Sequence, residues 1–257
     1  MQTTVKKWIG SGLSFGIFLG MISCEMEEDT NPPENQEEVQ LQSTARQTGE
    51  TDPGGRSMVN TMVVSDFQVG TREIEMKYAA EADIVAGIDL GSISLKSNID
   101  TELGADASEP QTLILISEGQ SRVSAVGEGS TPKGNYQEIQ FELYKNTTVE
   151  NEDPMYGKSL WISGEINGET SQVWMDTESV ISASAENEEG HEVNEGTELM
   201  LVFDLDDLFE NVDFEAAADA NSDGVIEIAP GDLDGNADLY SQIEANLESA
   251  VKFESGS

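Results

Sequence analysis

Short runs of alternating apolar and polar residues, separated by turns rich in glycine and asparagine, dominate the chain after residue 57. In one of these runs, Ile139, Phe141 and Leu143 alternate with polar residues, which is typical of a strand with one buried face. The runs occupy residues 58–70, 72–84, 89–97, 111–119, 121–129, 136–146, 159–166, 171–182 and 197–205. Many short strands of this kind predict a mainly β fold, built as an antiparallel β-sandwich.

Helical periodicity is confined to the C-terminal region. Apolar residues stand four positions apart at Leu239, Ile243, Leu247 and Val251. Side chains at this spacing share one face of a helix, so the stripe predicts a short C-terminal helix that packs on the sandwich. The segment 203–218 can form a second short helix.

One pair of strands can be aligned residue by residue. Asn167-Gly168 lies between two alternating runs and is the strongest sequence signal for a two-residue hairpin turn. A loop of this length places Trp161 opposite Trp174 on neighbouring strands. The two tryptophans are thereby predicted to lie side by side on the polar face of the hairpin.

The tryptophan pair has two interpretations. An aromatic pair surrounded by polar groups can serve as a stacking platform for sugar rings, which would make the domain a glycan-binding module that uses Trp161 and Trp174. Alternatively, the pair packs beneath a loop or helix and stabilises the hairpin by about 0.2–1 kcal/mol.

The first 23 residues have the organisation of a secretory signal peptide. Two lysines precede an uncharged, mostly apolar run over residues 8–22, and small residues precede Cys24. The apolar run is too short for a comfortable transmembrane helix. The four residues that end at Cys24 resemble the bacterial lipobox, with Met21 where leucine is usual. This resemblance implies that residues 1–23 are removed and that Cys24 becomes the lipid-bearing first residue.

Acidic residues follow Cys24 directly, at Glu25, Glu27, Glu28 and Asp29. This arrangement resembles the surface-export signal of Bacteroidota lipoproteins, which implies a lipid-anchored protein that faces outward from the outer membrane. Its partners would be the membrane, through the lipid, and a surface glycan or protein. Two alternatives stay open: attachment at the periplasmic face, and a soluble secreted protein in which Cys24 has no role. No other cysteine is available for an intrachain disulfide.

Composition divides the rest of the chain into two parts. Residues 24–56 lack a large apolar cluster and combine acidic residues with prolines and paired glycines, which predicts a disordered acidic tether. Residues 57–257 carry the β patterning and the helical stripe, and they are predicted to form one β-sandwich domain with a C-terminal helix. This length is ample for the core of one such domain.

The charge balance is strongly acidic: 51 aspartate and glutamate residues stand against 12 lysine and arginine residues, for a net charge of −39. Such a surface repels nucleic acid, so nucleic acid is not an expected partner, and it attracts cations and basic proteins. Dense carboxylates also keep a protein dispersed in a salty medium. Solubility therefore accounts for most of the charge without a binding role.

A second resemblance involves residues 127–146, GEGSTPKGNYQEIQFELYKN, in which Pro132, Gly134 and Tyr136 precede an alternating strand. The stretch resembles a signature of bacterial surface lipoproteins with a prealbumin-like or carbohydrate-regulatory β-sandwich, many of which are domains of unknown function. The resemblance implies an immunoglobulin-like or prealbumin-like sandwich and a surface location. It implies no catalytic residues.

The segment 219–236 begins like a calcium-binding loop. Oxygen-bearing side chains stand at its first, third and fifth positions, a glycine stands at the sixth, and the seventh offers a backbone carbonyl. The twelfth position, which normally holds a bidentate carboxylate, is Pro230, so a later aspartate would have to complete the shell. The candidate Ca²⁺ ligands are Asp219, Asn221, Asp223, Val225, Asp232 and Asp234. Alternatively, these side chains cap their own backbone amides and bind no ion.

Residues for the commonest catalytic arrangements are scarce. His191 is the single histidine and lies in a glutamate-rich segment, where a solvated loop residue is expected. A lone histidine and a lipidated cysteine leave no pair for zinc coordination or Cys–His nucleophilic catalysis. The sequence contains neither a phosphate-binding glycine loop nor a nucleophile elbow.

The sequence therefore predicts a non-enzymatic cell-surface lipoprotein with a structural, adhesive or binding role and, by hypothesis, a bound structural Ca²⁺. A glycan-binding module is the alternative function. A hydrolase that uses paired carboxylates is a third, because the fold and not the sequence spacing sets the distance between such groups.

Overall fold

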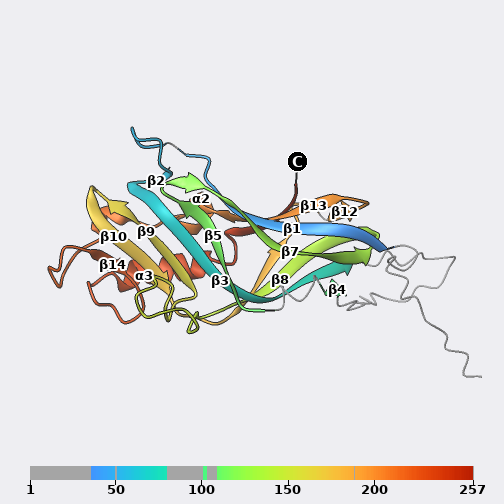
Figure 1. The fold of residues 1–257 in the computed structure, drawn as a ribbon. Coiled ribbons are helices and arrows are strands. Elements are labelled where there is room, and N and C mark those ends of the chain that lie inside the picture. Colours follow the sequence, from blue (N-terminus) through green and yellow to red (C-terminus); the bar gives the residue numbers. More distant parts are fainter. Residues whose placement is uncertain (1–35, 50, 80–100, 103–108, 188, 257) are drawn as a thin grey trace, which may run out of the picture. The chain divides into compact units, whose positions relative to one another are not determined.

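The computed structural model describes residues 36–49, 51–79, 101–102, 109–187 and 189–256 (Figure 1). The predicted signal peptide, Cys24 and the expected strand over residues 89–97 lie outside these described residues. Two β-sheets contain most of the described residues, and the mainly β sandwich that the sequence predicts is confirmed.

The smaller sheet contains, in spatial order, β15 (Val251–Ser255), β13 (Thr197–Asp204), β1 (Gln36–Arg46) and β7 (Val123–Pro132). The larger sheet follows the path β11 (Val180–Ser184), β8 (Gly134–Leu143), β3 (Met62–Ala79), β9 (Leu160–Ile166), β10 (Glu169–Met175) and β14 (Ile226–Ile228). Shorter strands pair beside this path: β2 (Met58–Val59), β4 (Thr101–Glu102), β5 (Gln111–Ser117), β6 (Gln120–Ser121) and β12 (His191–Val193). The helical segments are α2 (Leu205–Leu208), the 3₁₀ turn η1 (Phe214–Ala216) and α3 (Ala237–Asn246).

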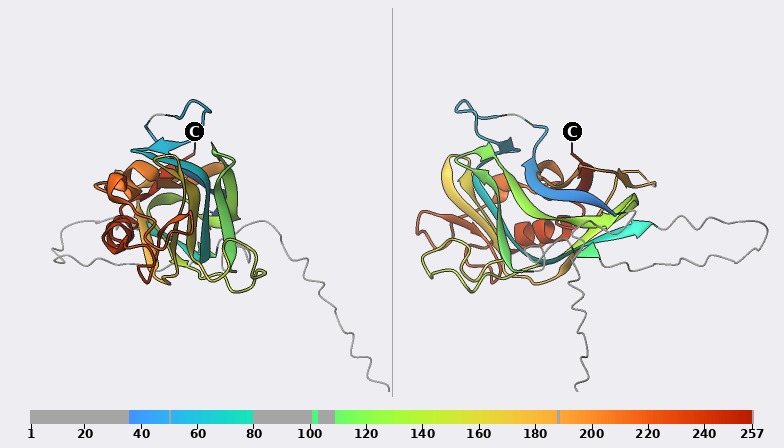
Figure 2. Two further views of the ribbon diagram at one scale, coloured as in Figure 1. Left: turned by 90° about the vertical axis from the view of Figure 1, so that its left-hand side faces the viewer. Right: turned by 45° about the vertical axis from the view of Figure 1, so that its right-hand side comes forward.

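The two sheets pack face to face around one hydrophobic core (Figures 1 and 2). The ring of Phe203 on β13 meets that of Phe67 on β3 edge-on at 5.8 Å between centroids, and it lies 6.1 Å from the ring of Phe141 on β8. Aromatic contacts of this geometry add about 0.5–1.5 kcal/mol each beyond the burial of area. On β8 the predicted alternation is confirmed, because Ile139, Phe141 and Leu143 are all buried.

Strand β1 occupies a central position in the smaller sheet, between β13 and β7 (Figure 1). It runs parallel to β13 and antiparallel to β7. Val39 and Leu41 of this strand are each 1% exposed and belong to the core. The prediction of a disordered tether over residues 24–56 is therefore wrong from Gln36 onward, and the sandwich begins about 20 residues earlier than the sequence indicates.

The reason for this correction is the spacing of small and apolar side chains in β1. Val39, Leu41, Ser43 and Ala45 are buried, whereas the residues between them are exposed or half-buried. Each strand of a sheet presents alternate residues to one face, so even a polar segment can bury every second side chain. Acidic residues at the start of the segment hide this pattern in the composition.

The hairpin prediction is confirmed in its register. Strands β9 and β10 pair antiparallel with Trp161 opposite Trp174. Asn167 and Gly168 form the turn with φ values of 54° and 83°, as a type I′ turn requires. The other edge of β10 pairs in parallel with β14.

A close approach of two backbones positions this hairpin against β3. The pairing of β3 with β9 contains an irregularity between Val64 and Asp66, and Gly164 of β9 stands opposite Val64. A Cβ atom on Gly164 would lie 1.9 Å from the carbonyl oxygen of Val63. Only glycine therefore fits here, as expected where a strand bulges toward its neighbour.

The short helix near the C-terminus is confirmed, but it does not end the chain. Helix α3 packs against β14 and α2, and its Ile243 is fully buried (Figure 1). The helical assignment of Val251 is wrong, because Val251 begins β15 and pairs with Phe203. Val251 fits both patterns: it stands four residues after Leu247, and it also alternates with Lys252 and the buried Phe253.

Candidate binding surfaces

Trp161 and Trp174 lie on the outer face of the β9–β10 hairpin. Their strand neighbours Ile162 and Val173 are fully buried, whereas both tryptophans are half-buried. Trp161 Nε1 donates a hydrogen bond to Oε1 of Gln172 at 3.3 Å. Part of each tryptophan side chain is therefore accessible to a ligand, and the rest is covered by the protein.

A lysine lies at the edge of this pair. Lys158 Nζ is 5.6 Å from the centre of the Trp174 ring, within cation–π range, and it donates a hydrogen bond to the carbonyl oxygen of Pro154 at 2.6 Å. Burial lowers the pKa of Lys158, and the nearby carboxylates of Glu227 and Asp153 oppose that shift. We refer to Trp161, Trp174, Gln172 and Lys158 together as the tryptophan face.

The loop that begins at Asp219 is held together by its own side chains. The carboxylate of Asp219 accepts hydrogen bonds from the amides of Asp223 and Gly224 at 3.2 and 2.9 Å. Asn221 Oδ1 accepts one from the amide of Asp223, and Asp223 Oδ1 accepts one from the amide of Val225. These are the local side-chain-to-backbone bonds expected of a turn rich in Asp and Asn.

Of the two later aspartates, Asp234 is the one that reaches this loop. It is fully buried, and its carboxylate accepts hydrogen bonds from the amides of Asn221 and Glu227 at 3.3 and 2.8 Å. Asp232 instead accepts one from the amide of Ala237, at the start of α3. Within the described ranges, no group of three or more His, Cys, Asp or Glu side chains is arranged to hold a metal ion. Calcium binding by this loop stays a prediction.

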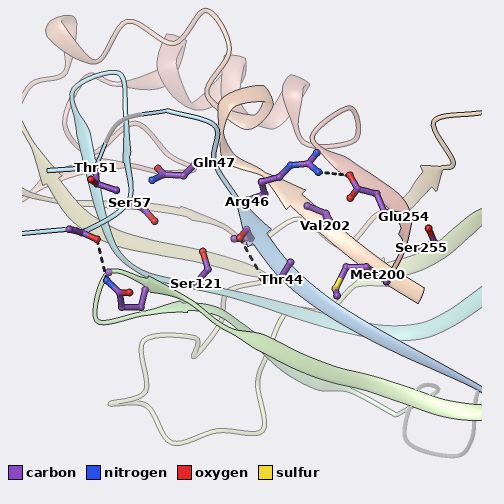
Figure 3. A pocket seen from close by; sticks show the side chains of 15 residues that line it. Thr44, Arg46, Gln47, Thr51, Ser57, Ser121, Met200, Val202, Glu254 and Ser255 are labelled. Carbon is purple, nitrogen blue, oxygen red and sulfur yellow. Dashed lines mark hydrogen bonds and ion pairs between the residues drawn. The ribbon is translucent and has the colours of Figure 1, made fainter. Parts of the chain in front are cut away.

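A groove that no sequence pattern indicated lies on the outer face of the smaller sheet (Figure 3). Its volume is about 590 Å³. Its described lining comes from β1, β13, β15 and the adjacent Gly256, from Gln47 and residues 51–57, and from residues 119–121. These segments are far apart in the sequence and share no motif, so only the folded chain brings them together.

Two charged residues, Arg46 and Glu254, occur among the described residues that line this groove. Arg46 Nη1 donates a hydrogen bond to Glu254 Oε1 at 2.6 Å (Figure 3). Arg46 Nε and Nη2 both donate to Oδ2 of Asp204, at 3.2 and 3.1 Å. The described lining thus contributes one carboxylate, which is paired with Arg46.

His191 is not the solvated loop residue that the sequence predicts. It lies on β12 and is half-buried, and its ring contacts that of Phe253 edge-on at 4.8 Å between centroids. Its Nε2 atom lies 2.9 Å from the carbonyl oxygen of Phe253. His191 therefore joins β12 to β15, which is a structural role.

No protein-family model, curated protein or solved structure matches this chain. The resemblance to prealbumin-like surface lipoproteins consequently stays a hypothesis. Among the helices that the described residues form, none has the length and hydrophobicity needed to cross a membrane.

Proposed function

We propose that this protein is a non-enzymatic, lipid-anchored protein of the outer bacterial surface that binds glycan chains through the tryptophan face. The observation that carries the binding role is the cross-strand pair of Trp161 and Trp174, in register and partly accessible. The anchoring role is inferred from the signal peptide and Cys24.

The chemistry of the tryptophan face suits a sugar. Indole rings offer flat apolar surfaces that match the C–H face of a pyranose, and their polar neighbours can bind hydroxyl groups. Gln172 supplies an amide and Lys158 an ammonium group beside the rings. The net charge of −39 disfavours anionic polysaccharides, so an uncharged glycan is the preferred class.

Tryptophan fluorescence tests the binding role, because Trp8 belongs to the signal peptide and the processed protein keeps only Trp161 and Trp174. We expect titration with maltohexaose, cellohexaose or chitohexaose to shift and quench the emission to saturation with at least one of these sugars. Trp174→Ala should weaken that binding about tenfold or more, as expected for a buried aromatic contact. Thr170→Ala, at an exposed position of the same hairpin, serves as the control and should bind normally. A response to none of the sugars refutes the glycan role.

Detergent partitioning tests the anchor. We expect the protein to enter the detergent phase, and Cys24→Ser to return it to the aqueous phase because serine cannot carry the thioether-linked lipid. Protease added to intact cells should degrade the wild-type protein if it faces outward. Equal partitioning of the two proteins would exclude lipidation at Cys24, and resistance to protease would favour the periplasmic face.

A further inference from the structure

The groove on the smaller sheet differs from the rest of the molecule in its charge. The chain as a whole has 51 acidic residues in 257, but the described residues that line the groove include one, Glu254, which forms an ion pair with Arg46. Arg46 is further held by Asp204. The described part of the lining is therefore nearly neutral, in contrast to the strongly acidic chain.

Several polar side chains that line the groove are available to bind a ligand. Oε1 of Gln47 is buried and has no hydrogen-bond partner among the described residues. The hydroxyl groups of Thr51 and Ser121 belong to exposed residues of the lining, and Ser57 beside them is 5% exposed. A buried acceptor without a partner destabilises the free protein, so a ligand that donates a hydrogen bond to Gln47 offsets this cost.

Other polar residues of the lining are committed and hold the groove in shape. Thr44 Oγ1 donates a hydrogen bond to the carbonyl oxygen of Arg122 at 2.8 Å. Gln120 Nε2 donates one to the carbonyl oxygen of Gly55 at 3.2 Å, which joins the two segments beside the sheet. The free hydroxyl groups are therefore presented by a fixed frame, which lowers the entropic cost of binding.

The groove also has an apolar part. Met200 and Val202 lie on the outward face of β13, where polar residues would be expected, and both line the groove (Figure 3). Val202 is 3% exposed. Met200, which is half-buried, therefore supplies the accessible apolar surface, and together with the nearby hydroxyl groups it matches a molecule with alternating C–H and O–H surfaces.

We propose that the groove is a second binding site, specific for a short uncharged oligosaccharide. Its volume of about 590 Å³ falls within the range of roughly 300–1,000 Å³ of small-ligand sites. Hydroxyl groups both donate and accept hydrogen bonds, so they match the serine, threonine and glutamine side chains that line the groove. A peptide fits less well, because its amides pair best with an open strand edge, and here the outer faces of the strands line the groove. The site is distinct from the tryptophan face, because Trp161, Trp174, Gln172 and Lys158 are not among the described residues that line the groove.

The test is calorimetric titration of the full chain with maltotriose, cellotriose and chitotriose, beside trigalacturonate as the anionic comparison and trialanine amide as the peptide comparison. We expect one of the neutral trisaccharides to bind with measurable heat and trigalacturonate to bind at least about tenfold more weakly. Ser57→Ala should weaken the binding about threefold to tenfold, the value of one hydrogen bond. Ser121→Trp, at an exposed position of the lining, should abolish it by filling the groove.

Thr147→Ala removes an exposed hydroxyl group outside the groove and should leave the affinity unchanged. Thermal melting of each variant separates loss of binding from loss of folding, and Ser121→Trp provides the decisive comparison if Ser57→Ala unfolds. The proposal is overturned if no neutral trisaccharide binds, if only trialanine amide binds, or if Ser121→Trp binds like the parent. Binding that Trp174→Ala removes and Ser121→Trp retains would support the tryptophan face and refute the groove.

Discussion

Shortening Leu41 to alanine is expected to destabilise the whole sandwich domain. Leu41 is 1% exposed and lies on β1, between β13 and β7 in the smaller sheet. A buried leucine replaced by alanine loses its transfer free energy and leaves a cavity, at a cost of about 2–5 kcal/mol. For a domain of this size each kcal/mol lowers the melting temperature by about 2–4 °C, so a loss of about 3 kcal/mol lowers it by about 6–12 °C.

Thermal and urea unfolding, followed by circular dichroism, measure this effect. Gln40→Ala is the matched control, because Gln40 is the adjacent residue of the same strand and is exposed. We expect this control to unfold within about 0.5 kcal/mol of the parent. If Leu41→Ala and Gln40→Ala melted together at the parent temperature, β1 would not be part of the sandwich, and the segment would be the tether that the composition suggests.

Three further predictions concern charge, backbone contact and calcium. The hydrogen bond from Arg72 holds the pKa of Glu142 below its ordinary value, so the stability that this pair adds should be lost as the pH falls below about 4.3. In Arg72→Met, the free energy of urea unfolding should therefore fall less steeply between pH 5 and pH 3 than in the parent. Gly164→Ala should cost about 2–3 kcal/mol in urea unfolding or prevent folding, because its Cβ atom would meet the carbonyl oxygen of Val63; a melt equal to that of the parent would contradict the close approach. If the loop after Asp219 binds calcium, millimolar Ca²⁺ but not Mg²⁺ should raise the melting temperature of the parent and not of Asp223→Ala; an unchanged parent melt would exclude that site.

Local patterns predicted the parts of the fold that depend on neighbouring residues. The Asn167-Gly168 turn fixed the register of β9 and β10, because a two-residue loop leaves one alignment of the two strands. The alternation in residues 136–146 likewise identified β8 and its buried face. In both cases the interactions that decide the structure are close together in the sequence.

Pairings between distant segments escaped prediction. The partner of β1 in parallel pairing is β13, far along the chain, and the polar composition of β1 concealed its buried face. The groove escaped for the same reason, because Arg46, Ser57 and Ser121 are distant in the sequence and come together only in the folded chain. At Val251 the helical and strand periods coincide, so spacing alone could not decide between them.

The parallel alignment of β1 and β13 has a mechanical consequence. A force that pulls Gln36 along the axis of β1 loads all the hydrogen bonds between Val39 and Arg46 at the same time. These bonds therefore share the force and break together in shear. A terminal strand peeled from a sheet edge would instead unzip one bond at a time. A domain attached through its N-terminus can therefore resist flow or traction without a disulfide, since the strand nearest the attachment is clamped on both sides.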